Sequence, residues 1–379
     1  MVRQSFRCLQ IVTTDHLSTL DNDGLSKCID TVARFCSQQA DLNISLTAVG
    51  LLWKIVDHLS SSGQGGSNGD DDSRWVKVYN KLGELCVDNR PPLRKSAAQT
   101  LFEALAAHSD RLKLQTFADL LWTVVFPLFD SVCQQAGVKF ESDDKPDRQI
   151  ALNEAKVWAE AHNVIISGAS RLFAQRQRVL KQMDNCSDVW QTFLNYLSWI
   201  AGHALPNEVS HSAVKALLEL CSTAWPVVGE PSNTKEIQFV EVEPPHFCKA
   251  LQNGQKVCNH PPEQVPYCDA WPAWLYITKQ LTKPSGNMVN NKPDVPTQQK
   301  LTDLIKALAQ LIPKILTMFK ANDCRKMIES LGGLIAVPVA ADAAPFVLPA
   351  ISNNYEAVMT QLQENVVGVL QNSQEVCTW

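Results

Sequence analysis

The stretch that decides the fold is residues 85–105, LCVDNRPPLRKSAAQTLFEAL. Its key positions are an acidic residue in a turn, an aliphatic-arginine pair at a helix start, two small residues one turn later and a leucine beyond them: Asp88, Leu93-Arg94, Ala97-Ala98 and Leu101. The aspartate can accept hydrogen bonds from free backbone amides, the alanines let neighbouring helices approach, and the leucines fill the seam between helix pairs. This order predicts the second helix of a repeated helix pair.

Two other stretches repeat this order of residue types more weakly. Residues 41–52 (DLNISLTAVGLL) and residues 207–220 each place small residues and leucines at matching positions after a polar start. Asp41 precedes Asp88 by 47 positions, at the upper end of the roughly 40 to 47 residues of a HEAT or armadillo repeat. The chain is therefore predicted to be all-α, a HEAT/armadillo-like α-solenoid of about a dozen helices or more.

Apolar residues recur at three- and four-residue steps along most of the chain, which is typical of helices with one buried face. This periodicity predicts helices over 6–20, 25–36, 42–59, 74–87, 93–107, 112–136, 150–183, 189–203, 208–224, 267–281, 297–320, 323–336 and 355–370. Strand hairpins ended by glycine are absent from the sequence. We therefore expect no sheet to organise the fold.

Composition divides the chain into segments. Residues 1–60 and 73–225 are predicted to be helical repeats, joined by a flexible linker over 61–72 that is rich in glycine, serine and aspartate. Residues 226–266 carry many prolines and a few β-prone residues, so they form either an irregular excursion or a disordered loop. Residues 267–379 are predicted to be C-terminal helical repeats, interrupted by a polar linker over 282–296.

Bulk composition excludes several classes of protein. With 379 residues, 45% of them hydrophobic and 19% charged, the chain can bury a substantial core. A net charge of -5 provides no basic field for nucleic acid. No apolar run approaches the roughly 20 residues that span a bilayer, since the nearest, 120–129, is half that length and contains Pro127. The start of the chain lacks a secretory signal. The twelve cysteines lie beside apolar neighbours, which is typical of buried, reduced, cytosolic thiols.

The sequence contains no recognisable catalytic constellation or cofactor site. It has neither GxxxxGK[ST] nor GxSxG, and its glycine-rich stretch 63–69 follows no strand. Its histidines are dispersed, and several fall near predicted helix ends, where capping or solvated roles are typical: His16, His58, His108 and His203. We therefore expect no catalytic residue and no cofactor.

A histidine- and cysteine-rich series within 246–268 has the residue types of a zinc site. Its members are His246, Cys248, Cys258, His260 and Cys268. Paired ligands in known zinc sites usually have two or more residues between them, and here only one residue separates each pair. The spacing favours scattered loop residues and no metal, with zinc as the alternative.

Aromatic and apolar residues near the C-terminus are candidates for a partner surface. Trp271 and Trp274 can place two rings on one helix face, although tryptophans are more often core residues. Phe346 and Leu348 lie in the apolar, proline-containing stretch 340–349, where they either dock on the last helix or stay exposed for a partner.

A run of cations is the candidate basic surface. Arg171, Arg176, Arg178 and Lys181 fall at the end of the predicted helix 150–183. Basic residues there complement the helix dipole, and an amphipathic basic helix can also bind an anionic lipid surface.

Three stretches carry a family resemblance: 42–53 (LNISLTAVGLLW), 82–102 (LGELCVDNRPPLRKSAAQTLF) and 335–349 (IAVPVAADAAPFVLP). Together they resemble the C-terminal half of the monensin-sensitivity (Mon-two) family. That family is related to the large Arf guanine-nucleotide exchange factors and lacks their Sec7 catalytic domain. The resemblance runs with gaps from Phe6 to about Leu370, and its first two blocks are highly specific.

The resemblance implies a non-catalytic scaffold of endosome-to-Golgi membrane trafficking. It implies a cytoplasmic location, peripheral on trans-Golgi network and endosome membranes, and three partners: a Dopey-family protein, an aminophospholipid flippase and an Arf-like GTPase. The alternatives are a regulatory, exchange-factor-like module of Arf-family GTPase signalling and a module that binds lipid surfaces. Members of the family are much longer than this chain, so we expect a segment of a longer protein, and the oligomeric state is left open.

Overall fold

The computed structural model describes residues 2–62, 70–135, 148–203, 206–223, 265–283, 288–289, 292–293, 296–337 and 361–374. Over these residues the chain is all-α apart from one short hairpin, which confirms the predicted class. The hairpin pairs β1 (Met288–Val289) with β2 (Lys292–Pro293) in antiparallel register and falls within the predicted linker 282–296. With two residues in each strand, it does not organise the fold.

The chain divides into two compact units, each with its own packed interior. Unit 1 comprises residues 1–137 and 156–184, and unit 2 comprises residues 138–155 and 185–379. The division falls inside the range 73–225, at the long helix α8 (Arg148–Gln175), whose first turns belong to unit 2.

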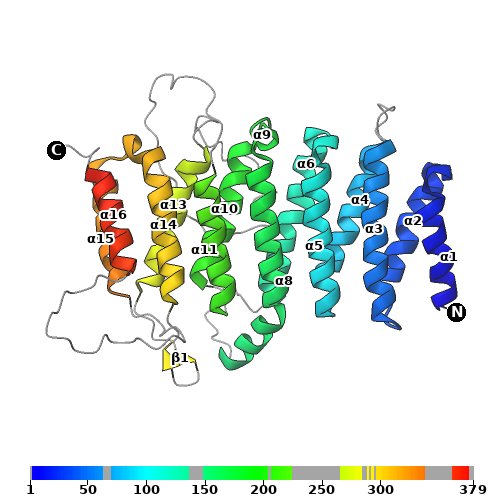
Figure 1. Ribbon diagram of the computed structural model, residues 1–379, viewed down its shortest axis with the longest axis horizontal. Coiled ribbons are helices and arrows are strands. Elements are labelled where there is room, and N and C mark those ends of the chain that lie inside the picture. Colours follow the sequence, from blue (N-terminus) through cyan, green and yellow to red (C-terminus); the bar gives the residue numbers. More distant parts are fainter. Residues whose placement is uncertain are drawn as a thin grey trace. The chain divides into compact units, whose positions relative to one another are not determined.

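Unit 1 consists of helices that pack in two layers. Its elements are α1 (Val2–Asp15), η1 (Leu17–Thr19), α2 (Asn22–Ser37), α3 (Leu42–Ser62), α4 (Asp70–Leu85), α5 (Pro91–His108), η2 (Ser109–Arg111), α6 (Leu114–Leu120), the π-helical segment η3 (Leu121–Val125), α7 (Phe126–Gln135), most of α8, and α9 (Gln177–Leu180). From α1 to α4, each helix contacts the next one and the next but one, so α1, α3 and α5 form one layer and α2, α4 and α6 the other (Figure 1). Helical structure extends into both ends of the range 61–72, since α3 ends at Ser62 and α4 begins at Asp70.

Unit 2 repeats the same packing scheme. Its elements are α10 (Cys186–His203), α11 (Asn207–Ser222), α13 (Val265–Leu281), α14 (Gln298–Ile315), η4 (Leu316–Met318), α15 (Ala321–Ile335) and α16 (Gln361–Gln374). In one layer α13 contacts α10 and α15, and in the other α14 contacts α11 and α16 (Figure 1). Contacts of α10 with α11, α13 with α14 and α15 with α16 join the two layers.

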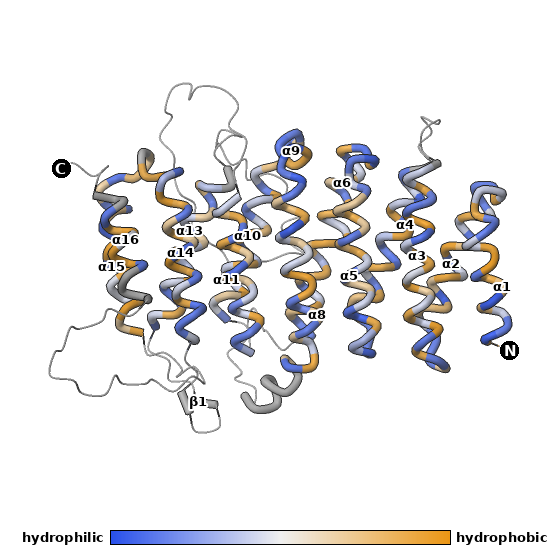
Figure 2. Tube along the Cα trace, in the orientation of Figure 1, coloured by the Kyte–Doolittle hydropathy of each residue, from blue (hydrophilic) through white to orange (hydrophobic). Residues whose placement is uncertain are grey.

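The cores lie between the layers and form from the apolar faces that the periodicity predicts. In α2 the buried side chains recur at three- and four-residue steps: Leu25, Cys28, Ile29, Val32, Ala33 and Cys36. Figure 2 shows hydrophobic and hydrophilic residues alternating along the helices in this way. Asp21 caps α2, because its side chain accepts a hydrogen bond of 2.7 Å from the amide of Gly24. Burial of such faces removes apolar surface from water and is the main favourable term in forming each unit.

One helical run corrects the expectation that no segment approaches the length of a membrane span. Leu114–Gln135, which combines α6, η3 and α7, is long and apolar enough to cross a membrane by length and composition. Within unit 1, however, 67% of its 18-residue window is buried, and Phe117, Leu121 and Phe129 are fully enclosed. A helix at the centre of a packed core has the same composition, and the burial of this run matches that role.

The described cysteines are free thiols, and all of them except Cys8 are buried, as the apolar neighbours of most of them predict. Burial in apolar surroundings disfavours the thiolate and raises the pKa of Cys36, Cys221 and Cys268 to about 12. Cys8 lies on the exposed side of α1, so the prediction of burial is wrong there.

Candidate functional site

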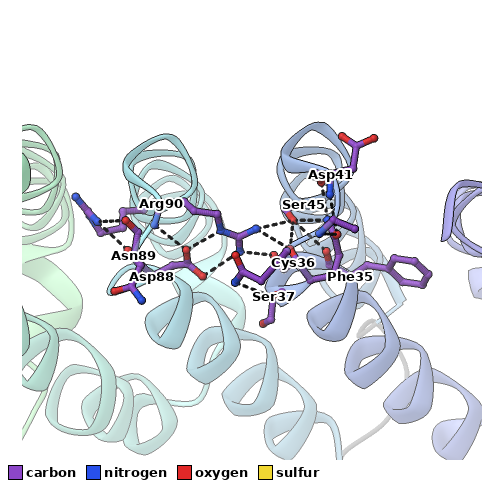
Figure 3. A network of polar contacts seen from close by, with 12 residues as sticks. Phe35, Cys36, Ser37, Asp41, Ser45, Asp88, Asn89 and Arg90 are labelled. Atoms are coloured by element: carbon purple, nitrogen blue, oxygen red, sulfur yellow. Dashed lines mark hydrogen bonds and ion pairs between the residues drawn. The ribbon is translucent and has the colours of Figure 1, made fainter.

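The turn between α4 and α5 contains a partly buried ion pair that joins successive helix pairs of unit 1. The guanidinium of Arg90 donates from Nε to Asp88 Oδ1 (2.8 Å) and from Nη2 to Asp88 Oδ2 (3.0 Å). It also donates to the carbonyls of Gln38 (2.6 Å) and Cys36 (3.0 Å) and to Ser45 Oγ (3.1 Å) (Figure 3). One side chain therefore supplies donors to the C-terminal end of α2 and to the first turn of α3.

The local sequence presets this geometry. Pro91 and Pro92 occupy the first two positions of α5, where a proline ring fixes the backbone angle and no amide is needed. The amide of Arg90 donates to Asp88 Oδ1 at 2.9 Å, which confirms the predicted role of the aspartate in the turn. Burial opposes ionisation of Asp88, but the hydrogen bonds and the charge of Arg90 outweigh it and lower the pKa of the carboxyl.

Arg94 joins α5 to α8 in the same unit. Its side chain is 1% exposed, and it donates to the carbonyls of Asp88 (2.8 Å), Asn89 (3.0 Å) and Val157 (2.8 Å). The guanidinium carbon lies 3.8 Å from the centre of the Trp158 ring, within cation-π distance. Desolvation lowers the pKa of Arg94, and the charge of Asp88 opposes that effect. The helix-start arginine of the sequence pattern thus acts as a buried crosslink.

Two lysines of α14 join helices in the same way in unit 2, and neither is among the residues predicted from the sequence. Lys300, which is 2% exposed, donates to the Ala201 carbonyl near the end of α10 (3.1 Å) and to Ser210 Oγ. Lys314 donates to the carbonyls of Cys221 and Thr223 at the end of α11. The burial of Lys300 could have been predicted from the sequence, because Lys300 shares the helix face of the buried leucines at positions 304, 308 and 311.

The structure separates the four predicted members of the basic surface. Arg171 and Arg178 are exposed, and Lys181 is half-buried. Arg176 turns inward and donates to the Ala106 carbonyl at the end of α5 and to the carboxylate of Asp110. The predicted helix 150–183 is also interrupted here, because α8 ends at Gln175 and Arg176 caps α9. The prediction that Arg176 belongs to an exposed basic surface is therefore wrong.

Trp271 and Trp274 lie in the core of unit 2, so the prediction that they form a partner surface is wrong. Both side chains are 0% exposed. Their rings stack on each other at 5.6 Å, and Trp271 also contacts the ring of Phe319 at 4.7 Å. Trp274 donates from Nε1 to the carbonyl of Leu304 in α14 at 2.8 Å. The later helices α14 and α15 cover this face of α13. The other two candidates, Phe346 and Leu348, lie outside the described residues.

Most of the histidine- and cysteine-rich series also lies outside the described residues, namely His246, Cys248, Cys258 and His260. Cys268 is described and buried, and its sulfur lies 4.0 Å from the sulfur of Met318. Within the part of the chain that the structure describes, no three histidine, cysteine, aspartate or glutamate side chains are grouped to hold a metal ion.

A buried cysteine-histidine pair in unit 1 escaped the sequence analysis, which treated the histidines as dispersed. The sulfur of Cys133 lies 3.6 Å from Nε2 of His162, and the two residues are 29 positions apart in the sequence. Burial raises the pKa of the Cys133 thiol and lowers that of His162 to about 4. Both groups are therefore neutral at pH 7. A nucleophilic cysteine needs a thiolate and access to substrate, and this enclosed pair has neither.

Two surface depressions contain several charged side chains. One lies between α2 and α4 in unit 1, and its cations and carboxylates are balanced: Asp30, Arg34, Lys81 and Glu84. Lys81 pairs with Glu84 at 2.9 Å, and Lys77 pairs with Asp30 at 2.7 Å. The other is a groove of about 580 Å³ between α13 and α15 in unit 2, where cations outnumber carboxylates.

Comparison with known proteins gives a consistent family match. A family model described as the C-terminal region of Mon2 protein matches residues 14–68, 65–250 and 265–379. The chain is 30% identical over 434 residues to Protein MON2 homolog of Xenopus laevis, covering 100% of the chain and 25% of that protein. It is 31% identical over 416 residues to the Drosophila melanogaster protein of the same name, covering 100% of the chain and 23% of that protein.

A more distant similarity extends to exchange factors. The chain is 26% identical over 172 residues to Brefeldin A-inhibited guanine nucleotide-exchange protein 3 of Arabidopsis thaliana, which covers 38% of the chain and 10% of that protein. The chain thus spans about a quarter of the length of the MON2 homologs that it matches.

Proposed function

The chain belongs to the Mon2 family, whose C-terminal region it matches, and on that premise we propose that it is a non-catalytic scaffold segment in endosome-to-Golgi membrane trafficking. The observation that carries this proposal is the family match, which extends over 100% of the chain with two of the relatives. The partners proposed on the same basis are a Dopey-family protein, an aminophospholipid flippase and an Arf-like GTPase. The proposed location is cytoplasmic, peripheral on trans-Golgi network and endosome membranes.

The proposed architecture is a HEAT/armadillo-like α-solenoid. Its support is the packing scheme within each unit, where helices contact the next but one in the same layer. Repeat proteins of this kind hold partners on extended faces, and each repeat contacts only its neighbours. Four cations join successive helices in each unit and keep such a face rigid: the buried Arg94 and Lys300 and the partly buried Arg90 and Lys314.

A non-catalytic role accords with the state of the chemically reactive groups that are described. The Cys133 and His162 side chains are neutral and enclosed. His211 is engaged at 2.8 Å with the carboxylate of Asp303, in the packing of α11 against α14. These groups serve packing between helices, and the proposed mechanism is equilibrium binding without covalent chemistry.

Affinity capture from cell extract tests the proposed function. The full chain, tagged and immobilised, should recover a Dopey-family protein or a flippase subunit well above the level retained by an unrelated helical-repeat protein with the same tag. Recovery of chaperones alone would contradict the scaffold proposal.

A second candidate function follows from the similarity to the exchange protein of Arabidopsis thaliana. As an exchange-factor-like module, the chain would accelerate release of a fluorescent nucleotide from an Arf-family GTPase. No acceleration at a large molar excess of the chain would reject that function and leave the scaffold proposal standing.

Lipid binding is a third candidate, because Arg171 and Arg178 are exposed in unit 1. Vesicles that contain phosphatidylserine should then carry the chain in a flotation assay, and Arg171→Glu with Arg178→Glu should abolish flotation. Flotation that persists in this double variant would reject the basic contact.

A further inference from the structure

The groove between α13 and α15 in unit 2 is open to the surface. Its lining residues are different from the cations Arg90, Arg94, Lys300 and Lys314 that join helices. Its volume of about 580 Å³ falls within the range of roughly 300–1,000 Å³ that is common for ligand sites. The C-terminal half of α13 forms one wall, including Leu275 and Tyr276, and α15 forms the other, including Ser330 and Gly333. Both helices belong to the same layer of unit 2.

The walls of this groove are firm. Tyr276 stacks with Trp199 at 6.2 Å and contacts the His203 ring at 6.0 Å, so α10 supports it from behind. At Gly333, α15 closely approaches the residue that follows α13, because a Cβ atom there would lie 3.0 Å from Cγ2 of Thr282. A preformed wall lowers the entropic cost of binding, because Tyr276 and the helix backbones need not be ordered when a ligand enters.

The charge in the groove is predominantly positive. Lys279, Lys283 and Lys326 line it together with one carboxylate, Glu329, and all four side chains are exposed. Lys283 donates to Oε1 of Gln280 at 2.8 Å, a neutral partner. Within the described residues, neither Lys279 nor Lys326 forms an ion pair. Lys279 lies in the last turn of α13, where a cation complements the helix dipole, but Lys326 lies in the middle of α15 and has no such role.

We propose that the groove between α13 and α15 binds an extended acidic segment of a partner protein, whose carboxylates pair with Lys279, Lys283 and Lys326. This inference rests on the proposed scaffold function and specifies the chemistry of one of its partners. A recessed site with an apolar and aromatic wall suits a peptide, which inserts side chains between the helices. A flat bilayer surface reaches into such a recess poorly, and the net charge of -5 opposes binding of nucleic acid.

Fluorescence anisotropy with the full 379-residue chain tests the proposal. The probe is a labelled octapeptide that alternates glutamate and leucine, and its control is the same peptide with glutamine in place of glutamate. The acidic peptide should bind at least tenfold more tightly than the glutamine peptide at low salt. Its affinity should fall as salt is raised, because exposed ion pairs are screened.

Three variants assign this binding to the groove. Lys279→Glu with Lys326→Glu should weaken binding of the acidic probe about tenfold or more, since attraction is replaced by repulsion. Ser330→Trp should weaken it by filling the groove without a change of charge. Lys215→Glu reverses one charge on the exposed side of α11, half the change of charge in the double variant, and should alter affinity less than about twofold. Helical content and melting temperature are compared across all variants, so that loss of folding is recognised.

Equal binding of the two peptides would overturn the proposal, as would equal loss in the Lys215→Glu variant. Vesicles of phosphatidylcholine with 20% phosphatidylserine form a separate arm, with the composition chosen to give roughly the surface charge of an anionic leaflet. Binding of vesicles but not of the acidic peptide, lost with Lys279 and Lys326, would assign the groove to membranes and also overturn the proposal. If capture from extract succeeds while the peptide fails, the groove assignment is wrong and the scaffold function stands.

Discussion

Replacing Arg94 by methionine should destabilise unit 1 by about 3–5 kcal/mol. The substitution removes a buried cation and leaves three carbonyl groups without their hydrogen-bond donor. The guanidinium is 1% exposed and bonds the carbonyls of Asp88, Asn89 and Val157 at 2.8 to 3.0 Å. A hydrogen bond from a charged donor contributes about 1.5–3 kcal/mol. Methionine retains most of the apolar contact with Trp158, so the loss reports mainly on the polar joint.

Two further substitutions make the measurement specific. Arg94→Lys keeps the charge, but one small ammonium group cannot reach both the carbonyls before α5 and the Val157 carbonyl in α8. It should therefore lower the free energy of unfolding by about half as much as Arg94→Met. Lys95→Met removes the neighbouring ion pair with Glu160, in which both side chains are largely exposed. It should change stability by less than about 1 kcal/mol.

Urea unfolding and hydrogen exchange measure the effect. Amide protection in α5 and α8 should fall in the Arg94→Met variant, while protection in α14 of unit 2 should be unchanged. If the free energy of unfolding of Arg94→Met lies within about 1 kcal/mol of that of the unchanged chain, the Arg94 hydrogen bonds do not stabilise unit 1 and the reasoning from them is refuted.

Three other predictions follow from single residues. Burial and the nearby Asp188 raise the pKa of Asp269 to about 7, so the folded state holds a proton that the unfolded state has lost. Stability of unit 2 should therefore decline by a few kcal/mol as pH rises from about 4 to about 7. Asp269→Asn should flatten the profile in a urea titration across pH, and an unchanged slope would contradict this origin. Arg176→Glu should lower the melting temperature of unit 1 by several degrees because Ala106 and Asp110 lose their donor, whereas Arg171→Glu on the exposed side should leave it nearly unchanged. Equal effects of the two arginine substitutions would show that the bonds of Arg176 to Ala106 and Asp110 do not stabilise unit 1. Gly168→Ala would place a Cβ atom 2.6 Å from the Phe102 ring and should cost about 1–3 kcal/mol by overpacking, whereas Gly50→Ala has open space and should be neutral or stabilising. Chemical denaturation of both glycine variants checks that difference, and a stable Gly168→Ala variant would contradict the close approach.

The helices could be predicted from the sequence because each depends on its own periodicity. The buried face of α2 and the turn at Asp88, Pro91 and Pro92 follow from residues that are close together in the chain. The same local information failed where burial depends on distant segments. Trp271 and Trp274 are enclosed because Leu304 of α14 and Phe319 contact them, and these two residues lie 30 or more positions further along the chain.

The candidate surfaces were harder to predict for the same reason. Arg176 resembles Arg171 and Arg178 in sequence, yet only Arg176 faces a helix end with free carbonyls. The groove between α13 and α15 combines residues about 50 positions apart, such as Lys279 and Lys326, so periodicity could not bring them together. A lysine on an apolar helix face, such as Lys300, is a local pattern from which a buried cation could have been predicted.

The central claim is that this chain is a binding scaffold of the Mon2 family, and direct binding between purified components tests it best. The full chain and a purified Dopey-family protein are mixed, and binding is followed by calorimetry. A saturable complex with a dissociation constant of about 1 μM or below is expected, which corresponds to roughly -8 kcal/mol. The absence of heat and of co-elution at concentrations well above that value would contradict the assignment of this partner to this segment.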